Sequence, residues 1–350
     1  MKKIALVELG GSHDECLYSQ LLFLKSKEGI NVDLFVNEKL KNNVQDFTLS
    51  DAIHFVKTEG ILDLWRVKKC WSKEKYDLVI FNTAQGSLLK KLFLIPFFNH
   101  PKFYGTLHNV AKLKSSKGQQ LISKYVNGYF VLNDQLKLKA KGFSSKSFTT
   151  FYPIFFPSYD RLNKKPDHET WILVPGQVEK KRRDYSALFQ SISIHGIDSS
   201  IKFVFLGKSK HKYGDGDWVD QKISELKCGD SFITWDNFIA VDDYHSWIQE
   251  CDYILPLIHN EHQSGKLYTH QTSGSYNLGH AYQLPFLLPS SFKGQEDWVG
   301  NSLFYDSIDN IMVLINRLSS SDKGQFSSPK KFSFDYQRQN YLSALGLDLM

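Results

Sequence analysis

The sequence predicts an α/β fold built from two domains, and three observations support this. The chain has 350 residues, whereas a single domain usually has roughly 150. Short apolar runs bounded by glycine or polar residues alternate with helical patterns, as in parallel sheets buried on both faces. The composition turns polar and charged at residues 158–169. We therefore expect domains at 1–157 and 170–332, a linker at 158–169 and a C-terminal helical segment at 333–350.

The first domain opens with a β-α-β unit. Its strands are predicted at 3–7 and 32–36, around a helical pattern at 17–25. The intervening loop has Gly10 and Gly11 but lacks the third glycine of a dinucleotide-binding fingerprint, so such a site is not expected. Further elements of this domain are predicted as strands at 77–83, 103–109 and 126–133.

His13 lies on this loop, at the carboxyl end of the first strand, where open α/β sheets bind ligands. A histidine there can act as a general base near neutral pH. The adjacent Asp14 and Glu15 can orient the ring or replace it. A polar surface histidine without a function is the alternative.

An apolar run with two lysines covers residues 88–98 and is either an interfacial helix or a core helix. Pro96 shortens the helix that this run can form, so we expect a core helix. Phe97 and Phe98 belong to the same run.

The second domain repeats the alternation. A helix is predicted at 244–250, and a long polar loop at 261–270 is expected to line the ligand site. The strands are predicted at 171–176, 201–207, 232–235, 251–258, 285–289 and 303–305, and helices at 308–318 and 334–345.

Two turns of the second domain suit an anionic ligand. The cations at 180–183 follow the turn at Gly176 and can offset the charge of a diphosphate, with arginine offering a planar fork of donors. Ser273, Gly274 and Ser275 suit a helix N-terminus, whose free N–H groups and dipole favour a phosphate. A solvated basic loop and a simple helix cap are the alternatives.

Charge is divided unequally along the chain, whose net charge is +6. Residues 1–166 hold 26 basic and 14 acidic residues (+12), and residues 167–350 hold 17 and 23 (−6). A basic half suggests contact with an anionic membrane surface; no nucleic-acid-binding motif is present, so we expect no nucleic-acid partner. The four cysteines lack metal-like spacing, and no secretory signal is expected, which indicates a reduced, cytoplasmic protein.

The order of strand, polar loop, Ser-Gly-Ser, short helix, Ala-x-x-x-Pro and strand at 251–289 resembles the nucleotide-sugar site of GT-B glycosyltransferases, in particular the family 4 (group 1) type. Three further motifs share the resemblance. His108-Asn109 ends a strand as that family's His-Asp does, Arg182 stands six residues after Gly176, and Gly207 ends a strand.

This resemblance implies two Rossmann-like domains facing a cleft, with a C-terminal helix that crosses back to the first domain. It implies a nucleotide-diphosphate sugar as donor and no required metal or cofactor. His108 would contact the substrate, and the loop before Tyr244, including Val241, would hold the base. The residues implied for the diphosphate are Gly176, Arg182 with Arg183 as its alternative, Thr272, Ser273, Gly274 and Ser275.

Two glutamates of the family are absent, since His270 and Leu278 stand at their positions. Asn277, His270 and Glu261 are candidates to replace them. The donor and the stereochemistry of transfer therefore stay open.

The sequence thus predicts a glycosyltransferase that moves a sugar onto a glycan or lipid-linked glycan of surface polysaccharide. Arg182 and the serine turn would stabilise the departing diphosphate, and His13, Asp14 or Glu15 would activate the acceptor if transfer inverts. A nucleotide-sugar 2-epimerase and a non-catalytic binding protein of the same architecture are the alternatives.

Overall fold

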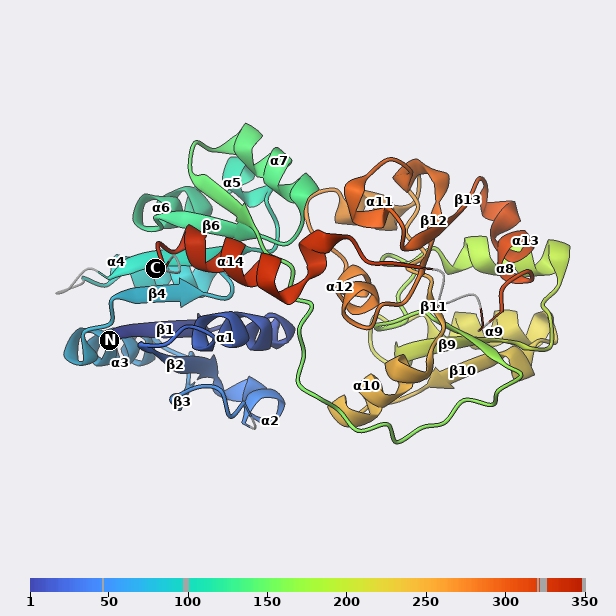
Figure 1. The fold of residues 1–350 in the computed structure, drawn as a ribbon, viewed down its shortest axis with the longest axis horizontal. Helices are drawn as coiled ribbons and strands as arrows, with labels where there is room; N and C mark the ends of the chain where they lie inside the picture. Colours follow the sequence, from blue (N-terminus) through green and yellow to red (C-terminus); the bar gives the residue numbers. More distant parts are fainter. Residues whose placement is uncertain (46, 97–100, 320, 322–325, 348–350) are drawn as a thin grey trace. The chain divides into compact units, whose positions relative to one another are not determined.

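The structure is a computed structural model that describes residues 1–45, 47–96, 101–319, 321 and 326–347 (Figure 1). The chain divides into two compact units. Unit 1 comprises Met1–Pro157, His270–Thr272 and Lys331–Met350, and unit 2 comprises Ser158–Thr269 and Ser273–Lys330. Each unit contains one sheet and its own hydrophobic core. The predicted two-domain α/β fold is therefore confirmed.

Unit 1 is built on a seven-stranded parallel sheet in the order β3-β2-β1-β4-β5-β6-β7. Residues 4–7 of β1 and all of β4 are apolar and buried, because helices cover both faces of the sheet. The strands are β1 (Lys2–Glu8), β2 (Ile30–Asn37), β3 (Ala52–Val56), β4 (Leu78–Phe81), β5 (Lys102–Leu107), β6 (Gly128–Val131) and β7 (Ser147–Thr150). The helices are α1 (Leu17–Lys25), α2 (Lys41–Val44), α3 (Ile61–Glu74), α4 (Ser87–Leu94), α5 (Lys112–Ser115), α6 (Lys117–Tyr125) and α7 (Asp134–Phe143).

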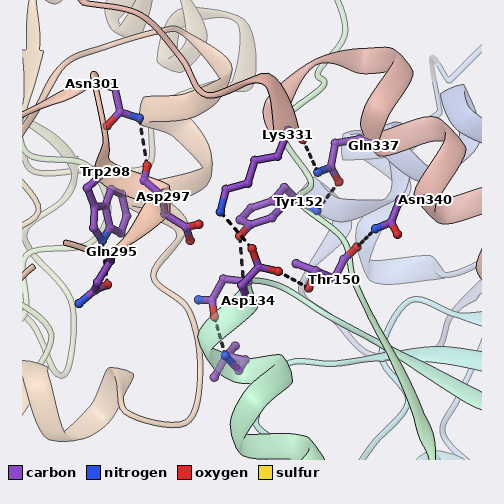
Figure 2. Close-up of polar contacts among 12 residues, drawn as sticks. Asp134, Thr150, Tyr152, Gln295, Asp297, Trp298, Asn301, Lys331, Gln337 and Asn340 are labelled. Carbon is purple, nitrogen blue, oxygen red and sulfur yellow. Dashed lines mark hydrogen bonds and ion pairs between the residues drawn. The ribbon is translucent and has the colours of Figure 1, made fainter.

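The C-terminal helix α14 (Phe334–Ala344), red in Figure 1, returns to unit 1 and packs against α1 and β7. Tyr341 is buried and stacks on Phe130 with ring centroids 4.4 Å apart. This position confirms the predicted return of the last helix to the first domain. Figure 2 shows three polar contacts that hold the segment: Gln337 with Tyr152, Asn340 with Thr150, and Lys331 with Asp134.

Unit 2 repeats the arrangement with six parallel strands in the order β10-β9-β8-β11-β12-β13. The strands are β8 (Thr170–Leu173), β9 (Ile201–Lys208), β10 (Phe232–Trp235), β11 (Tyr253–Ile254), β12 (Phe286–Pro289) and β13 (Ser302–Tyr305). The helices are α8 (Tyr185–His195), α9 (Gly216–Glu225), α10 (Val241–Glu250), α11 (Gln263–Tyr268), α12 (Gly274–Ala281) and α13 (Ile311–Ile315).

Both sheets reverse their strand order beside their first strand. The reversal lies between β1 and β4 in unit 1 and between β8 and β11 in unit 2. At such a point the connections leave to opposite faces of the sheet, so a crevice opens beyond the carboxyl ends of the two strands. Each unit therefore has one preferred place for a ligand.

Several local predictions were wrong. The segment at 261–270 was expected to be a loop, but it contains α11, whose N-cap His262 accepts the Ser264 N–H at 3.1 Å. Gly207 lies within β9 rather than at its end. The run at 251–258 forms a strand for only two residues, and Leu257 further along it takes a left-handed conformation (φ 52°).

Helix α4 and the length of the helices in general bear on possible membrane contact. Helix α4 ends at Leu94 before Pro96 and buries Leu89, Leu92 and Phe93, which confirms the predicted core helix; Phe97 and Phe98 lie outside the described residues. None of the helices in the described ranges is both long enough and apolar enough to cross a bilayer.

Candidate functional site

The turn after β8 is the first part of the candidate site in unit 2. Gly176 has φ +94°, which side-chain-bearing residues rarely adopt. The turn passes directly over β9, because a Cβ on Gly207 would lie 2.4 Å from the Gly176 carbonyl. Gly207 is therefore required by this close approach of two backbones, which explains a glycine inside a strand.

Arg183 lies buried beneath this turn. Its side chain is 5% exposed, and its Nη2 donates to Ser275 Oγ at 3.0 Å. Its Nε has no hydrogen-bond partner, and no carboxylate of the described residues lies within 4.0 Å of the guanidinium. A buried cation without a counter-charge is costly, and an anion beside Arg183 would lower that cost.

The Ser-Gly-Ser turn provides the partner of Arg183. Ser273 is the N-cap of α12, where its Oγ accepts the Ser275 N–H at 3.4 Å and lies 3.1 Å from Ser275 Oγ. Both serines are 2% exposed. The turn is therefore a helix cap, and it also presents hydroxyl groups and free N–H groups beside the arginine.

Arg182 and Lys181 are held differently from Arg183. Arg182 Nε donates to Glu179 Oε2 at 2.8 Å, and Lys181 Nζ lies 3.1 Å from the same oxygen. Glu179 is buried, so this carboxylate anchors the two basic side chains to the interior of unit 2. The charge of Arg182 is partly neutralised by Glu179, and its side chain also interacts with Tyr268.

These groups surround a cavity of about 280 Å³ in unit 2. Six predicted site residues line it: Gly176, Arg182, Arg183, Ser273, Gly274 and Ser275. Five further residues line it: Pro175, Gln177, Tyr244, Tyr268 and Leu278. Of these, Tyr268 lies in the segment 261–270 that was expected to line the ligand site, and Leu278 stands at the position of an absent family glutamate. Tyr244 was missed because it lies on helix α10, where a spacing typical of core residues gave no functional signal.

Five other predicted residues do not line this cavity, and one of them, Glu261, is exposed. Val241 begins α10, whose Tyr244 lines the cavity instead, and Asn277 is buried within α12, whose Leu278 lines it. His270 and Thr272 belong to unit 1, where the His270 carbonyl accepts the Val110 N–H at 2.9 Å.

The candidate catalytic residues of unit 1 meet beyond the carboxyl ends of β1 and β5. The rings of His13 and His108 stack with centroids 3.8 Å apart. His13 Nδ1 lies 3.3 Å from Glu15 Oε1, whereas Asp14 accepts a hydrogen bond from Asn43 at 2.9 Å. Glu15 is therefore the carboxylate that orients His13.

The surroundings shift the pKa values of the two rings in opposite directions. Burial lowers the pKa of His13, but the hydrogen bond and charge of Glu15, with Glu8 and Asp14, more than offset this, so the net pKa is raised. Burial lowers the pKa of His108 to about 4, and the charge of His13 adds to the effect. His108 is therefore neutral at pH 7, while the raised pKa of His13 favours its protonated form.

Glu8 is a buried carboxyl group at the end of β1 and was not among the predicted site residues. It is fully buried and accepts hydrogen bonds from Gly10 N at 2.6 Å, Asn82 Nδ2 at 2.7 Å and Thr83 Oγ1 at 2.6 Å. Burial raises the pKa of Glu8. An acidic residue ending an otherwise apolar strand was the available signal.

Metal ligands are not clustered in the part of the chain that the structure describes: no three His, Cys, Asp or Glu side chains there could hold an ion together. The four cysteines are all free.

No protein-family model and no curated protein matches the sequence. Solved structures do match it over nearly the whole chain. Anabaena Alr3699/HepE, crystallised with UDP-glucose, aligns with a TM-score of 0.68 at 13% identity, covering 99% of this chain and 100% of its own. The lipopolysaccharide outer core galactosyltransferase WaaB gives 0.61 at 12% identity, with 99% of each chain covered. A UDP-N-acetylglucosamine 2-epimerase gives 0.59 at 12%, with 99% and 97% covered. The chain thus has the two-domain GT-B fold of these structures.

Proposed function

We propose that this protein is a glycosyltransferase that takes a sugar from a nucleotide-diphosphate sugar bound in unit 2. The observation that carries the proposal is Arg183, a buried cation without a carboxylate partner among the described residues, beside two serine hydroxyls and a helix N-terminus. A diphosphate supplies the missing negative charge and accepts the available N–H and O–H groups. The fold shared with structures that contain UDP or UDP-glucose supports the same ligand class.

The proposed chemistry is the departure of a nucleoside diphosphate. When the bond from the anomeric carbon to the phosphate oxygen breaks, negative charge grows on that oxygen. Arg183, Arg182 and the Ser273–Ser275 turn stabilise it from fixed positions, the largest contribution that such a site can make. The groups are held before the reaction by Ser275 and Glu179, so little reorganisation is needed.

Unit 1 supplies acceptor activation in this proposal. With Nδ1–H donating to Glu15, the lone pair on His13 Nε2 is free to accept a proton, since Nε2 has no partner in the described part of the chain. The acceptor hydroxyl forms a bond to the anomeric carbon, its proton passes to His13, and the diphosphate leaves. One displacement of this kind inverts the anomeric centre, which product NMR would reveal.

The acceptor that we propose is a glycan or lipid-linked glycan of surface polysaccharide. The +12 charge of residues 1–166 suits the anionic inner surface of a membrane, so we also propose peripheral binding there from the cytoplasmic side. Sedimentation with anionic and zwitterionic vesicles at low and high salt tests this part separately.

Binding of nucleotides tests the central proposal. We expect UDP, GDP, CMP or dTDP to raise the melting temperature of the purified protein, because a ligand that binds only the native state stabilises it. Calorimetry then gives the affinity of the best nucleotide. If no nucleotide binds, the site does not hold a donor, and a non-catalytic role in binding glycans or partner proteins is favoured.

A nucleotide-sugar 2-epimerase is the second candidate, because one of the matching structures is such an enzyme. Incubation with the nucleotide sugar alone separates the two. An epimerase converts the sugar without an acceptor, whereas a transferase at most hydrolyses it slowly. Accumulation of the epimer would replace the transferase proposal.

A further inference from the structure

Asn82 lies at the centre of a buried hydrogen-bond network next to the two histidines of unit 1. It follows β4 directly and is fully buried. Its Nδ2 donates to Glu8 Oε2 at 2.7 Å and to the His13 carbonyl at 2.7 Å. Its Oδ1 accepts from Gln20 Nε2 at 2.6 Å. Both protons and the oxygen of the amide are therefore used, so its orientation is fixed.

The main chain of Asn82 fixes the second ring. His108 Nε2 lies 2.9 Å from the Asn82 carbonyl oxygen. A carbonyl can only accept, so Nε2 must carry the proton and Nδ1 must carry the lone pair. The His13 ring that stacks on His108 is held at its own main chain by the same asparagine.

The conformation of His13 needs such a restraint. Its φ is 70°, a left-handed value that costs free energy in a residue with a side chain. The hydrogen bond from Asn82 to its carbonyl opposes relaxation of the loop. Glu8 holds the preceding turn through Gly10 N, so both ends of the loop are tied to the point where the strand order reverses.

We propose that Glu8 and Asn82 form a positioning unit that holds the His13 ring against His108 and places a buried negative charge beside it. This inference rests on the proposed function only in the role it gives to His13. The charged groups that face the two rings are Glu8 from β1, Asp14 and Glu15 from the His13 loop, and Lys112 from α5. Glu8 is the buried one, and it has no cationic partner within 4.0 Å in the described ranges.

The network extends to the C-terminal helix. Tyr341 Oη donates to Gln20 Oε1 at 2.9 Å, and Gln20 in turn donates to Asn82. A side chain near the end of the sequence thus supports the loop near its beginning. The positioning unit therefore depends on α14 being docked on unit 1.

NMR titration of the histidine rings tests the proposal without any substrate. In the unmodified protein we expect His108 to remain neutral with Nε2 protonated from pH 5.5 to 8, and His13→Gln identifies the His13 signals. In Glu8→Gln, which has nearly the same shape, we expect the His13 titration midpoint to fall by about half a pH unit. Asp33→Asn is the matched control, since Asp33 is also buried, accepts from Tyr76 Oη, and lies on the neighbouring strand β2; it should leave the midpoint unchanged.

A titrating His108, or an Nδ1-protonated one, would overturn the assignment of the ring. Equal midpoints in Glu8→Gln and the unmodified protein would overturn the role of Glu8. Asn82→Ala should also lower kcat for transfer while leaving nucleotide affinity unchanged; an equal loss of both would indicate a general structural role instead. If the unmodified protein binds no nucleotide, the proposed function fails, while the titrations still decide this inference.

Discussion

The two units share one sheet topology, but opposite charges are buried where their strand order reverses. In unit 1 the strand that begins the sheet ends in Glu8, a fully buried carboxyl group held by neutral donors. In unit 2 the turn after the equivalent strand covers Arg183, a buried guanidinium held by a serine hydroxyl. Neither group has an oppositely charged partner within 4.0 Å in the described part of the chain.

This difference supports the proposal that the fold supplies the crevice and that the buried charge selects the ligand or the chemistry there. A cation at a helix N-terminus favours an anion such as a diphosphate. An anion beside a histidine favours the protonated ring and so supports proton transfer. The comparison predicts that changes in unit 1 affect the rate and changes in unit 2 affect donor binding.

The largest effect is expected from His13→Gln in unit 1. Loss of the general base should lower kcat for transfer by about 1000-fold. The dissociation constant of the nucleotide, measured by calorimetry, should not change, because the nucleotide is assigned to unit 2. A weakened nucleotide affinity in this variant would contradict the division of roles.

Arg183→Met should come next, with about 100-fold weaker binding of the nucleoside diphosphate, because the buried cation that faces the phosphates is lost. The free protein should melt at a higher temperature, since an uncompensated buried charge is removed. Lys181→Met, in the same turn but with a side chain 53% exposed, is the control and should change neither quantity strongly.

The pH dependence should reflect unit 1. The pKa of His13 lies above its ordinary value of 6.5, and the base must be unprotonated to act. The transfer rate at saturating donor should therefore rise with pH through a midpoint above 6.5 and level off. In His13→Gln this rise of the rate with pH should be absent. If the rise persists, it belongs to the titration of another group.

Ser275→Ala should weaken nucleotide binding, raising the dissociation constant by about fivefold, because one hydrogen bond to the ligand or to Arg183 is lost. Asn277→Ala is the control, because Asn277 lies on the same helix but does not line the cavity. Equal affinity in Ser275→Ala and the unmodified protein would mean that Ser275 only orients Arg183 in the free state.

The smallest effect is expected from Tyr341→Phe, which keeps the ring on Phe130 and removes one buried hydrogen bond to Gln20. The free energy of unfolding should fall by about 1 kcal/mol. Denaturant melts measure this, and nucleotide affinity should stay constant. A change in affinity instead would show that α14 influences unit 2.

The sequence by itself determined the elements whose pattern is strong and local. The apolar runs at β1, β4, β8 and β12 predicted the two sheets, because strands buried on both faces must be apolar throughout. Pro96 correctly ended α4, since its ring cannot continue a helix. The basic turn and the Ser-Gly-Ser turn were also recognised, since strand ends and helix starts leave characteristic residues.

Only the tertiary structure decided which of these residues meet. The sequence analysis preferred Arg182, but Arg182 is tied to Glu179, while Arg183 is buried against Ser275, 92 positions away in the chain. The contacts of Glu8 and Asn82 could not be predicted either, because their partners come from distant parts of the chain. Local spacing carries no information about contacts that arise when β1 pairs with β4, and those contacts set the burial and charge on which the chemistry depends.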